Sequence, residues 1–491
     1  MKALPLRAVI PAVAAIVLVV GGLAVWKLGG SDKDAGDDAG DVAADDVDAS
    51  GAFIVKRNGG WCWFQDERVI VDGSKVLVGT VAGTTRDGST AGDIEVTTFD
   101  LGNKSSRGAV LHGKLNSDDH ASPSLLRLAD GRYLSAYTTP GKDKLMRWRV
   151  SDGAGDGVAW QAEQTLKLEG NVTYSNLSLA PGAEGHVARV FNFYRRGDNS
   201  PGFMSAPPGG MFEDHGALLS WTRKSPTFDE KKSARKSEPK PYVQYATRGG
   251  VTHFITTEDH PRTYDNSVYH GFIKGYALHD SQGQVLDEDI RSGEPVELTK
   301  LTRIYEGNRD NIAWTVDLDV DESGKPFVAF LVQKDGQRRS SKKDLGGEDH
   351  RFHYAKFDGK AWQTHEIAYA GSMLYQHEVN YTGLVALVPK NPNVMFLSTN
   401  VDPVTGKAVA AEPNGDQQEE VKGRYELYRG DTQDDGKTWK WSALTKKSKR
   451  DNIRPVVPEW DGGTLVLWLR GSYKSMSSYD MDVVGMLNPS P

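Results

Sequence analysis

The chain has 491 residues and a formal net charge of −7, which is enough length for two or three average domains or one large β-fold. Much of the acidity lies in one short N-terminal segment, and no basic patch stands out, so the composition excludes nucleic acid as a partner. Cys62 is the only cysteine, which excludes an intrachain disulfide, and we interpret it as a small apolar core residue.

The N-terminus carries an apolar run from Ala8 to Trp26, preceded by Lys2 and Arg7. At about 1.5 Å per residue this run is just long enough to span the hydrocarbon core of a bilayer. The basic residues before it favour an N-terminus inside the cell and export of the rest. We therefore expect residues 1–28 to be an uncleaved signal anchor, with a cleaved signal peptide as the alternative. The remainder would lie outside the cytoplasm, in the periplasm or the extracellular space.

Residues 29–51 consist mostly of Asp, Gly, Ala and Ser and are expected to form a disordered acidic linker, because they bury too little apolar surface to fold. From residue 52 to 491, short runs alternate apolar and polar side chains between Gly, Asp and Pro turns, which is typical of antiparallel strands. The clearest predicted strands are Lys75–Val81, Ile94–Phe99, Tyr133–Tyr137, Lys144–Val150, Val251–Thr256, Pro326–Val332 and Thr464–Leu469. So many short strands predict an all-β domain with the architecture of a seven-bladed β-propeller.

One turn motif supports this architecture. Residues 432–439 read Thr-Gln-Asp-Asp-Gly-Lys-Thr-Trp, the pattern of an Asp box, in which the acid and hydroxyls tie down a hairpin turn and the Trp packs between sheets. Residues 151–160 form a degenerate copy. An Asp box indicates a fold and not a reaction.

The most distinctive polar cluster is Asp118-Asp119-His120, which lies directly before a predicted strand. A loop that ends there would deliver two acids and a histidine onto a β-scaffold, and functional side chains gather on such loops. His120 is therefore the first candidate for a functional residue, with Asp119 orienting its ring.

Several motifs occur together in the order expected of one family: Gly59–Arg68 with its Trp-Cys-Trp-Phe core, Asp118–Pro123, Tyr194–Gly197, Asp259–His270 and Asn452–Pro458. On these motifs the chain resembles bacterial BNR repeat-containing proteins, from about residue 53 to the C-terminus. That family is similar to seven-bladed propellers that include ulvan lyases and, more distantly, sialidases. The resemblance implies a propeller that acts on an acidic polysaccharide by β-elimination.

The resemblance to ulvan lyases also implies three catalytic residues, His120, Tyr174 and Arg195. A lyase must offset the charge of a uronate carboxylate before the neighbouring proton can be removed. Arg195 would bind the carboxylate, His120 would act as the base, and Tyr174 would donate a proton to the leaving oxygen, or exchange roles with His120. Ser175 stands where the family motif has a proline.

A wider set of residues is expected to bind the substrate: Asp119, Tyr242, Tyr245, His260, Asn266, His377 and Arg454. We assign no metal ligands and no required cofactor. A structural metal ion is left open, including a zinc site built from His260, His270 and an acid, and we expect a monomer.

Two other functions are consistent with the same scaffold. A glycoside hydrolase would need paired carboxyl groups, for which Asp66, Asp119 and Asp259 are candidates. A sialidase-like enzyme would gather Arg68, Arg195 and Arg454 around an acidic sugar, and the third function is a non-catalytic glycan-binding propeller.

Overall fold

A computed structural model of the chain describes residues 51–490 except 85, 87, 181–187, 223–238, 337–345, 376–377 and 410–422. The expected anchor at residues 1–28 lies outside this described part, as does the linker up to residue 50. None of the described helices has the length and apolar character needed to cross a membrane.

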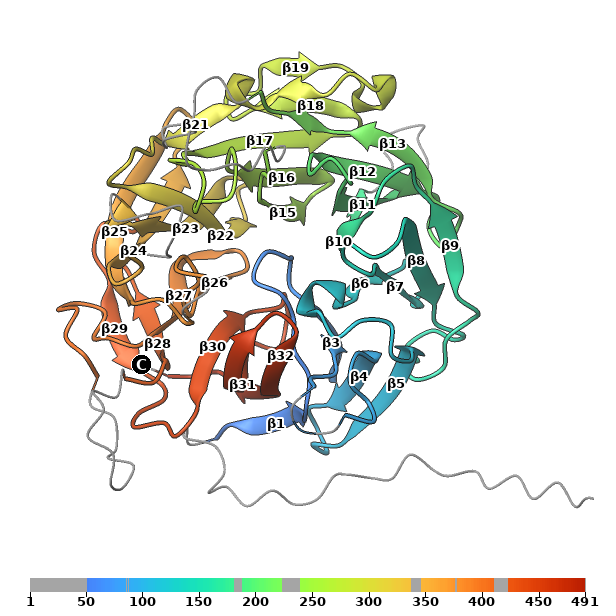
Figure 1. The fold of residues 1–491 in the computed structure, drawn as a ribbon, viewed down its shortest axis with the longest axis horizontal. Helices are drawn as coiled ribbons and strands as arrows, with labels where there is room; N and C mark the ends of the chain where they lie inside the picture. Colours follow the sequence, from blue (N-terminus) through green and yellow to red (C-terminus); the bar gives the residue numbers. More distant parts are fainter. Residues whose placement is uncertain are drawn as a thin grey trace, which may run out of the picture. The chain divides into compact units, whose positions relative to one another are not determined.

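The described residues form seven β-sheets that follow one another around a central axis (Figure 1), so the predicted all-β, seven-bladed propeller is confirmed. The first three blades are β2 (Val69–Asp72), β3 (Lys75–Val81), β4 (Ile94–Asp100) and β5 (Ser106–His112); β6 (Ser124–Arg127), β7 (Tyr133–Tyr137), β8 (Leu145–Val150) and β9 (Gln164–Lys167); and β10 (Thr173–Ala180), β11 (Arg189–Arg195), β12 (Pro201–Ala206) and β13 (Glu213–Ala217).

The fourth blade is larger and contains β15 (Val243–Arg248), β16 (Val251–Thr256), β17 (Val268–Lys274), β18 (Ala277–Asp280) and β19 (Val285–Asp287), with β21 (Thr302–Tyr305) paired to β17. A short parallel pair, β14 (Leu219–Ser220) and β20 (Val296–Glu297), lies outside the blades. The fifth and sixth blades are β22 (Ile312–Val320), β23 (Pro326–Gln333), β24 (His350–Phe357) and β25 (Trp362–Gly371); and β26 (Val385–Val388), β27 (Asn391–Thr399), β28 (Glu426–Asp431) and β29 (Lys440–Ala443). The described helices are 3₁₀ turns: η2 (Asp119–Ala121), η3 (Ile290–Ser292) and η4 (Leu298–Lys300).

The seventh blade closes the ring by combining both ends of the domain. It contains β30 (Asp451–Val456), β31 (Leu465–Ser475), β32 (Ser478–Leu487) and, from the N-terminal side, β1 (Phe53–Lys56). Strand β1 pairs antiparallel with β32, and the ring of Phe53 stacks on that of Phe99 in the first blade at 5.0 Å between centroids. Backbone pairing and an aromatic contact therefore join the last blade to the first.

Both predicted Asp-box turns have the expected hydrogen bonds. Asp434 Oδ1 accepts from the backbone N–H of Thr438 at 2.9 Å, and Trp439 Nε1 donates to the Gly436 carbonyl at 3.0 Å. The degenerate copy makes the same indole bond, from Trp160 Nε1 to the Gly157 carbonyl at 3.0 Å. The sequence prediction of two copies of this turn is thus confirmed, in blades six and two.

The Trp-Cys-Trp-Phe motif occupies the centre of the ring, where the chain between β1 and β2 passes (Figure 1). We call residues 59–68 the axial segment. The side chains of Trp61, Cys62, Trp63 and Phe64 are each at most 2% exposed. Phe64 stacks on Trp314 of the fifth blade at 4.0 Å between ring centroids. The motif therefore fills the central channel, which explains why so many aromatic residues stand together in the sequence.

Candidate functional site

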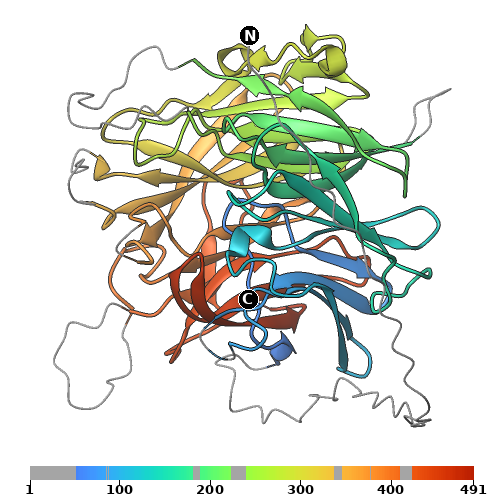
Figure 2. The same ribbon diagram turned by 45° about the vertical axis from the view of Figure 1, so that its right-hand side comes forward.

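The turn η2, drawn in cyan in Figure 2, presents His120 directly before the innermost strand of the second blade. Asp118 caps this turn, because its Oδ1 accepts from the backbone N–H of His120 at 3.0 Å. The same oxygen lies 2.6 Å from His120 Nδ1, and Asp119 Oδ1 lies 3.0 Å from it. Tyr473 of the seventh blade donates its hydroxyl to Asp119 Oδ2 at 2.7 Å. Two carboxylates therefore fix the orientation of the imidazole ring.

The axial segment supports the same turn from inside the channel. Gln65 Nε2 donates to the His120 carbonyl at 3.0 Å, and Gln65 Oε1 accepts from the Ser122 hydroxyl at 2.6 Å. A single amide side chain thus bonds to η2 on both sides of Ala121, which is fully buried. This contact holds the backbone of His120 in place.

Tyr174 reaches the channel because the start of β10 is irregular. Its φ of +68° lies in the left-handed region, which is rare for an aromatic residue and costs on the order of 1–3 kcal/mol. The pairing with β11 shifts register between Thr173 and Asn176 at this point. Ser175, in the place of the family's proline, donates its hydroxyl to Asn192 Oδ1 at 2.8 Å. The bulge turns the phenol of Tyr174 toward the axis.

The structure brings the three predicted catalytic residues together. The rings of His120 and Tyr174 stack with centroids 5.3 Å apart and an angle of 23°. The guanidinium carbon of Arg195 lies 4.7 Å from the Tyr174 ring and 4.4 Å from the Tyr242 ring. Among the described residues, the buried hydroxyl of Tyr174 has no hydrogen-bond partner.

Burial and local charges set the protonation of this group. Burial lowers the pKa of His120, but the Cys62 thiol, Asp118 and Tyr174 outweigh it and raise that pKa well above its usual range. Burial raises the pKa of Tyr174, against the charges of Arg195 and His120, so its phenol stays protonated. A neutral acid and a strongly basic imidazole therefore stand side by side.

A second half of the site comes from the fourth and sixth blades. The ring of His260 packs edge-on against Tyr242 at 5.7 Å, and His260 Nε2 lies 3.6 Å from Glu378 Oε2. Arg262 forms an ion pair with the same carboxylate. The side chains of His120, Glu378 and His260 are 12–15% exposed, and that of Arg262 is 30% exposed. These partly exposed side chains mark the side of the site that a substrate can reach.

The second half contains two residues that the sequence prediction missed, Lys240 and Glu378. The charge of Arg195, followed by burial, lowers the pKa of Lys240 to about 8. Lys240 and Arg262 in this half, together with Arg195 from the third blade, bring three cationic groups beside the carboxylate of Glu378, which favours an anionic ligand. Glu378 belongs to the same sequence cluster as the predicted His377, which was the available signal.

Comparison with known proteins identifies the family of the chain. The model of a BNR repeat-containing family matches residues 79–370. The chain belongs to this family. A search of curated proteins gives no match to this chain.

Solved structures share the propeller fold of this BNR protein at low sequence identity. A PL25 ulvan lyase bound to -[GlcA(1-4)Rha3S]- is 12% identical, with a TM-score of 0.58 over 88% of this chain and 94% of that chain. The polysaccharide lyase Uly1 is 9% identical, with a TM-score of 0.54 over 90% of this chain and all of that chain. These similarities establish a common fold.

Three predicted substrate-binding residues of the BNR protein, Asn266, Tyr245 and Arg454, are placed differently from His120. Asn266 is fully buried, and its amide group bonds to both the N–H and the carbonyl of Asp259, so it ties down a loop instead of facing a sugar. Tyr245 stacks on Phe193 at 4.2 Å in the core. Arg454 bonds to the Trp61 carbonyl and so supports the axial segment. His377 lies outside the described residues.

Of the groups expected for the alternative functions, Asp119 and Arg195 lie in the cluster around His120, and the others make contacts elsewhere. Arg68 donates to the Ser175 carbonyl at 2.7 Å and Arg454 donates to the Trp61 carbonyl, so two of the arginines expected for a sialidase-like cluster are bonded to the backbone. Asp259 caps the backbone N–H groups of Lys240 and His260. Among the described residues, His260 and His270 are not part of a group that could hold a metal ion, and His270 lies 3.1 Å from His253 inside the fourth blade.

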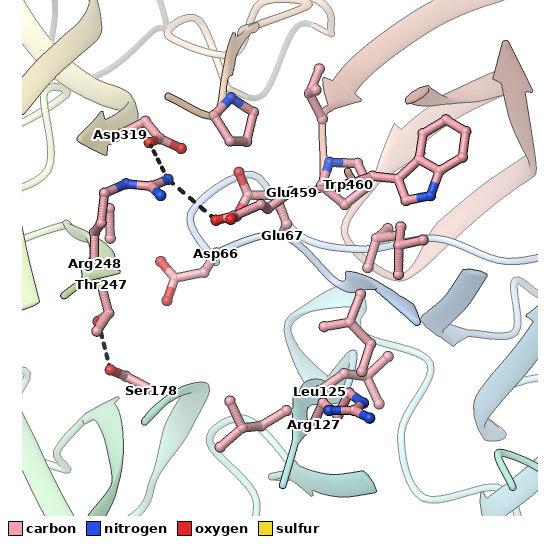
Figure 3. Close-up of a pocket in the computed structure, with 18 of the residues that line it drawn as sticks. Asp66, Glu67, Leu125, Arg127, Ser178, Thr247, Arg248, Asp319, Glu459 and Trp460 are labelled. Carbon is pink, nitrogen blue, oxygen red and sulfur yellow. Dashed lines mark hydrogen bonds and ion pairs between the residues drawn. The ribbon is translucent and has the colours of Figure 1, made fainter. Parts of the chain in front are cut away.

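A cavity of about 870 Å³ (Figure 3) is lined by the inner strands of several blades and by the axial segment. Its lining includes Arg127 and Arg248, which end β6 and β15, whereas His120 and Tyr242 precede these strands. Arg248 is already engaged, since its Nη2 lies 3.5 Å from Asp319 and 3.2 Å from Glu459. His120, Tyr174 and Arg195 are therefore not among the residues that line this cavity.

The floor of this cavity carries acids from the axial segment. Burial raises the pKa of Asp66 to about 7, against the charge of Arg68. Burial, together with the charges of Asp66 and Asp319, raises the pKa of Glu67 to about 8. Asp66 also accepts from the Tyr245 backbone N–H at 3.1 Å and lines this cavity, which does not contain His120.

Proposed function

We propose that the protein is a polysaccharide lyase that cleaves a uronate-containing acidic polysaccharide by β-elimination. The observation that carries this proposal is the convergence of His120, Tyr174 and Arg195, with stacked rings and a guanidinium group 4.7 Å from the phenol ring. The fold that the chain shares with ulvan lyases supports the same reaction class by analogy.

The proposed reaction begins with binding of the uronate carboxylate to Arg195, whose planar guanidinium forms paired hydrogen bonds with carboxylates. Neutralising this charge acidifies the proton on the adjacent C5 atom. His120 in its unprotonated form removes that proton, and its raised pKa makes it a strong base in that form. The electron pair forms the C4–C5 double bond as the C4–O bond breaks. Tyr174 gives its phenolic proton to the departing oxygen.

This division of roles follows from the environment of each group. Burial keeps the Tyr174 phenol protonated, so it suits the role of proton donor. Asp118 and Asp119 hold the His120 ring through Nδ1, which leaves Nε2 to face a substrate. The elimination uses groups of this chain alone, and Lys240 and Arg262 would bind further anionic groups along the polymer.

We also propose that the domain acts outside the cytoplasm, as a monomer held to the membrane by residues 1–28. The support is the apolar run with its preceding basic residues and a substrate class, the polyanionic polysaccharides, that is too large to enter a cell freely. Fractionation of cells that express the full chain, followed by protease accessibility of the propeller, tests this placement.

The test of the reaction is incubation of the purified full-length protein with uronate polysaccharides while ultraviolet absorbance of unsaturated ends is recorded. Replacing the base (His120→Ala) should lower kcat by about 10²–10⁴-fold, and Tyr174→Phe should lower it by a similar factor. The matched control is His215→Ala, on the outermost strand of the third blade, which should retain full activity.

Two results would contradict the proposal. New reducing ends without any unsaturated product would indicate hydrolysis, the reaction of the glycoside hydrolase alternative. Binding of the polymer without any cleavage, unchanged in His120→Ala, would indicate a glycan-binding propeller.

A further inference from the structure

One cluster around His120 has the composition of a metal site. Cys62 comes from the axial segment, while Asp119 and His120 come from η2. One ligand atom from each of the three residues lies within 4.8 Å of the other two. Over the described part of the chain, this is the single group of three or more His, Cys, Asp or Glu side chains that meets this criterion.

The three ligand types match a thiophilic divalent cation. Zinc binds thiolate sulfur at about 2.3 Å and imidazole nitrogen or carboxylate oxygen at about 2.0–2.2 Å, which places tetrahedral ligands on the order of 3.5 Å apart. In the structure Asp119 Oδ1 lies 3.0 Å from His120 Nδ1, and one ligand atom from each of the three residues lies within 4.8 Å of the other two, so small side-chain movements would bring them to this spacing. Thiolate and carboxylate together carry two negative charges, which a divalent cation neutralises, and the thiol proton is released to solvent on binding.

The carboxylate of Asp119 is prepared for such a role. The residue is 1% exposed, and its Oδ2 is held by the Tyr473 hydroxyl at 2.7 Å. Its Oδ1 lies 3.0 Å from His120 Nδ1 as an ion-pair contact and has no other hydrogen-bond partner among the described residues. Ligating carboxylates are commonly held in this way by a second residue, which orients the free oxygen toward the ion.

A Cys, a His and an Asp could also form a catalytic site in which the histidine activates the cysteine as a nucleophile. The burial of Cys62 argues against this function. Cys62 is 1% exposed and lies between Trp61 and Trp63, which are each at most 2% exposed. A polymer chain cannot reach this sulfur. An ion can, because the side chain of His120 is 12% exposed at the mouth.

We propose that Cys62, Asp119 and His120 together bind one zinc-class divalent cation, with the fourth position open toward the mouth of the site. Binding removes His120 from proton transfer, so the metal-loaded protein is the inactive form. The binding stands on the cluster alone, whereas this inhibition rests on the proposed lyase function.

The test uses the full-length protein after treatment with a chelator, titrated with Co²⁺ as the spectroscopic probe. We expect one equivalent to bind with a near-ultraviolet thiolate-to-cobalt charge-transfer band, and Zn²⁺ to abolish the band by displacement. Cys62→Ser should remove the band and weaken Zn²⁺ binding by at least about 100-fold. Asp119→Asn provides a second ligand variant, His215→Ala provides the control, and thermal unfolding confirms that each variant is folded.

The outcomes separate the two proposals. Absence of the thiolate band, or unchanged Zn²⁺ affinity in folded Cys62→Ser, overturns the metal site whatever the enzymatic activity. If the wild type shows the band and the chelator-treated protein forms unsaturated ends, added Zn²⁺ should abolish that activity in the wild type. Activity that persists in the fully loaded protein would overturn the inhibitory role, while absence of activity in the metal-free protein would instead count against the lyase.

Discussion

The substitution Glu67→Gln should make the protein more stable at alkaline pH. Burial and neighbouring acids raise the pKa of Glu67 from its ordinary 4.5 to about 8 in the folded protein, so the fold holds a proton that the unfolded chain releases. Such a group contributes its full stability below about pH 4.5 and loses it as pH rises toward 8. Glutamine resembles the protonated acid and does not titrate.

The magnitude follows from the shift. A difference of about 3.5 pKa units is equivalent to roughly 5 kcal/mol over the whole titration, at 1.36 kcal/mol per unit. Between pH 5.5 and 8.5 a single such group would lose about 3 kcal/mol. Water reaches this partly buried carboxyl, and its titration is coupled to that of the neighbouring Asp317. We therefore expect the wild type to lose about 2 kcal/mol of unfolding free energy through Glu67 over this pH range.

Urea unfolding at the two pH values measures the effect, with tryptophan fluorescence as the signal. The free energy of unfolding of the wild type should fall by about 2 kcal/mol more than that of Glu67→Gln. Glu322→Gln, on an exposed turn, is the matched control and should follow the wild type. Parallel pH dependence in the wild type and Glu67→Gln would refute the reasoning, because Glu67 would then titrate alike in the folded and unfolded states.

Three further substitutions test other parts of the molecule. Arg195→Lys keeps the charge but loses the planar fork, so kcat/KM on a uronate polymer should fall at least about tenfold, and equal kinetics would remove Arg195 from carboxylate binding. Phe53→Ala deletes the stack on Phe99 that joins the first and last blades and should cost about 2–3 kcal/mol in urea unfolding; no loss would show that β1 pairing alone closes the ring. Hydrogen bonds with Thr438 lower the pKa of Asp434 to about 2, so Asp434→Ala should lower the midpoint of thermal unfolding. An unchanged midpoint would show that this Asp box does not stabilise the fold.

Much of the fold was predictable because it depends on local patterns. Period-two alternation located strands such as Tyr133–Tyr137 and Val251–Thr256 to the residue, since side chains on a strand must point to alternate faces. The Asp box at residues 432–439 identified a propeller turn directly. In contrast, the role of the Trp-Cys-Trp-Phe motif as a channel filler depends on contacts with distant blades, which no local pattern contains.

The site was less predictable because its residues come from several blades, and only the folded structure brings them together. The motif gave His120, and the resemblance gave Tyr174 and Arg195. Tyr245 lies only three residues after Tyr242, yet it packs in the core against Phe193, because three steps along the chain move its side chain to the opposite face and farther along β15. Asn266 has the chemistry of a sugar ligand, but its hydrogen bonds are spent on the local backbone.

The axial segment links these observations, because one stretch of ten residues contributes to both the candidate site and the cavity of about 870 Å³. Gln65 holds the His120 carbonyl at 3.0 Å, while the next two residues carry the acids with raised pKa values that line the cavity. Ionisation of Glu67 at alkaline pH therefore places an unfavourable charge two residues from the support of the proposed base. Since the segment is bound through Arg68 and Arg454 to blades three and seven, a displacement there would be transmitted to η2. The wild type should accordingly lose stability as pH rises toward 8, and Glu67→Gln should remove this part of the pH dependence.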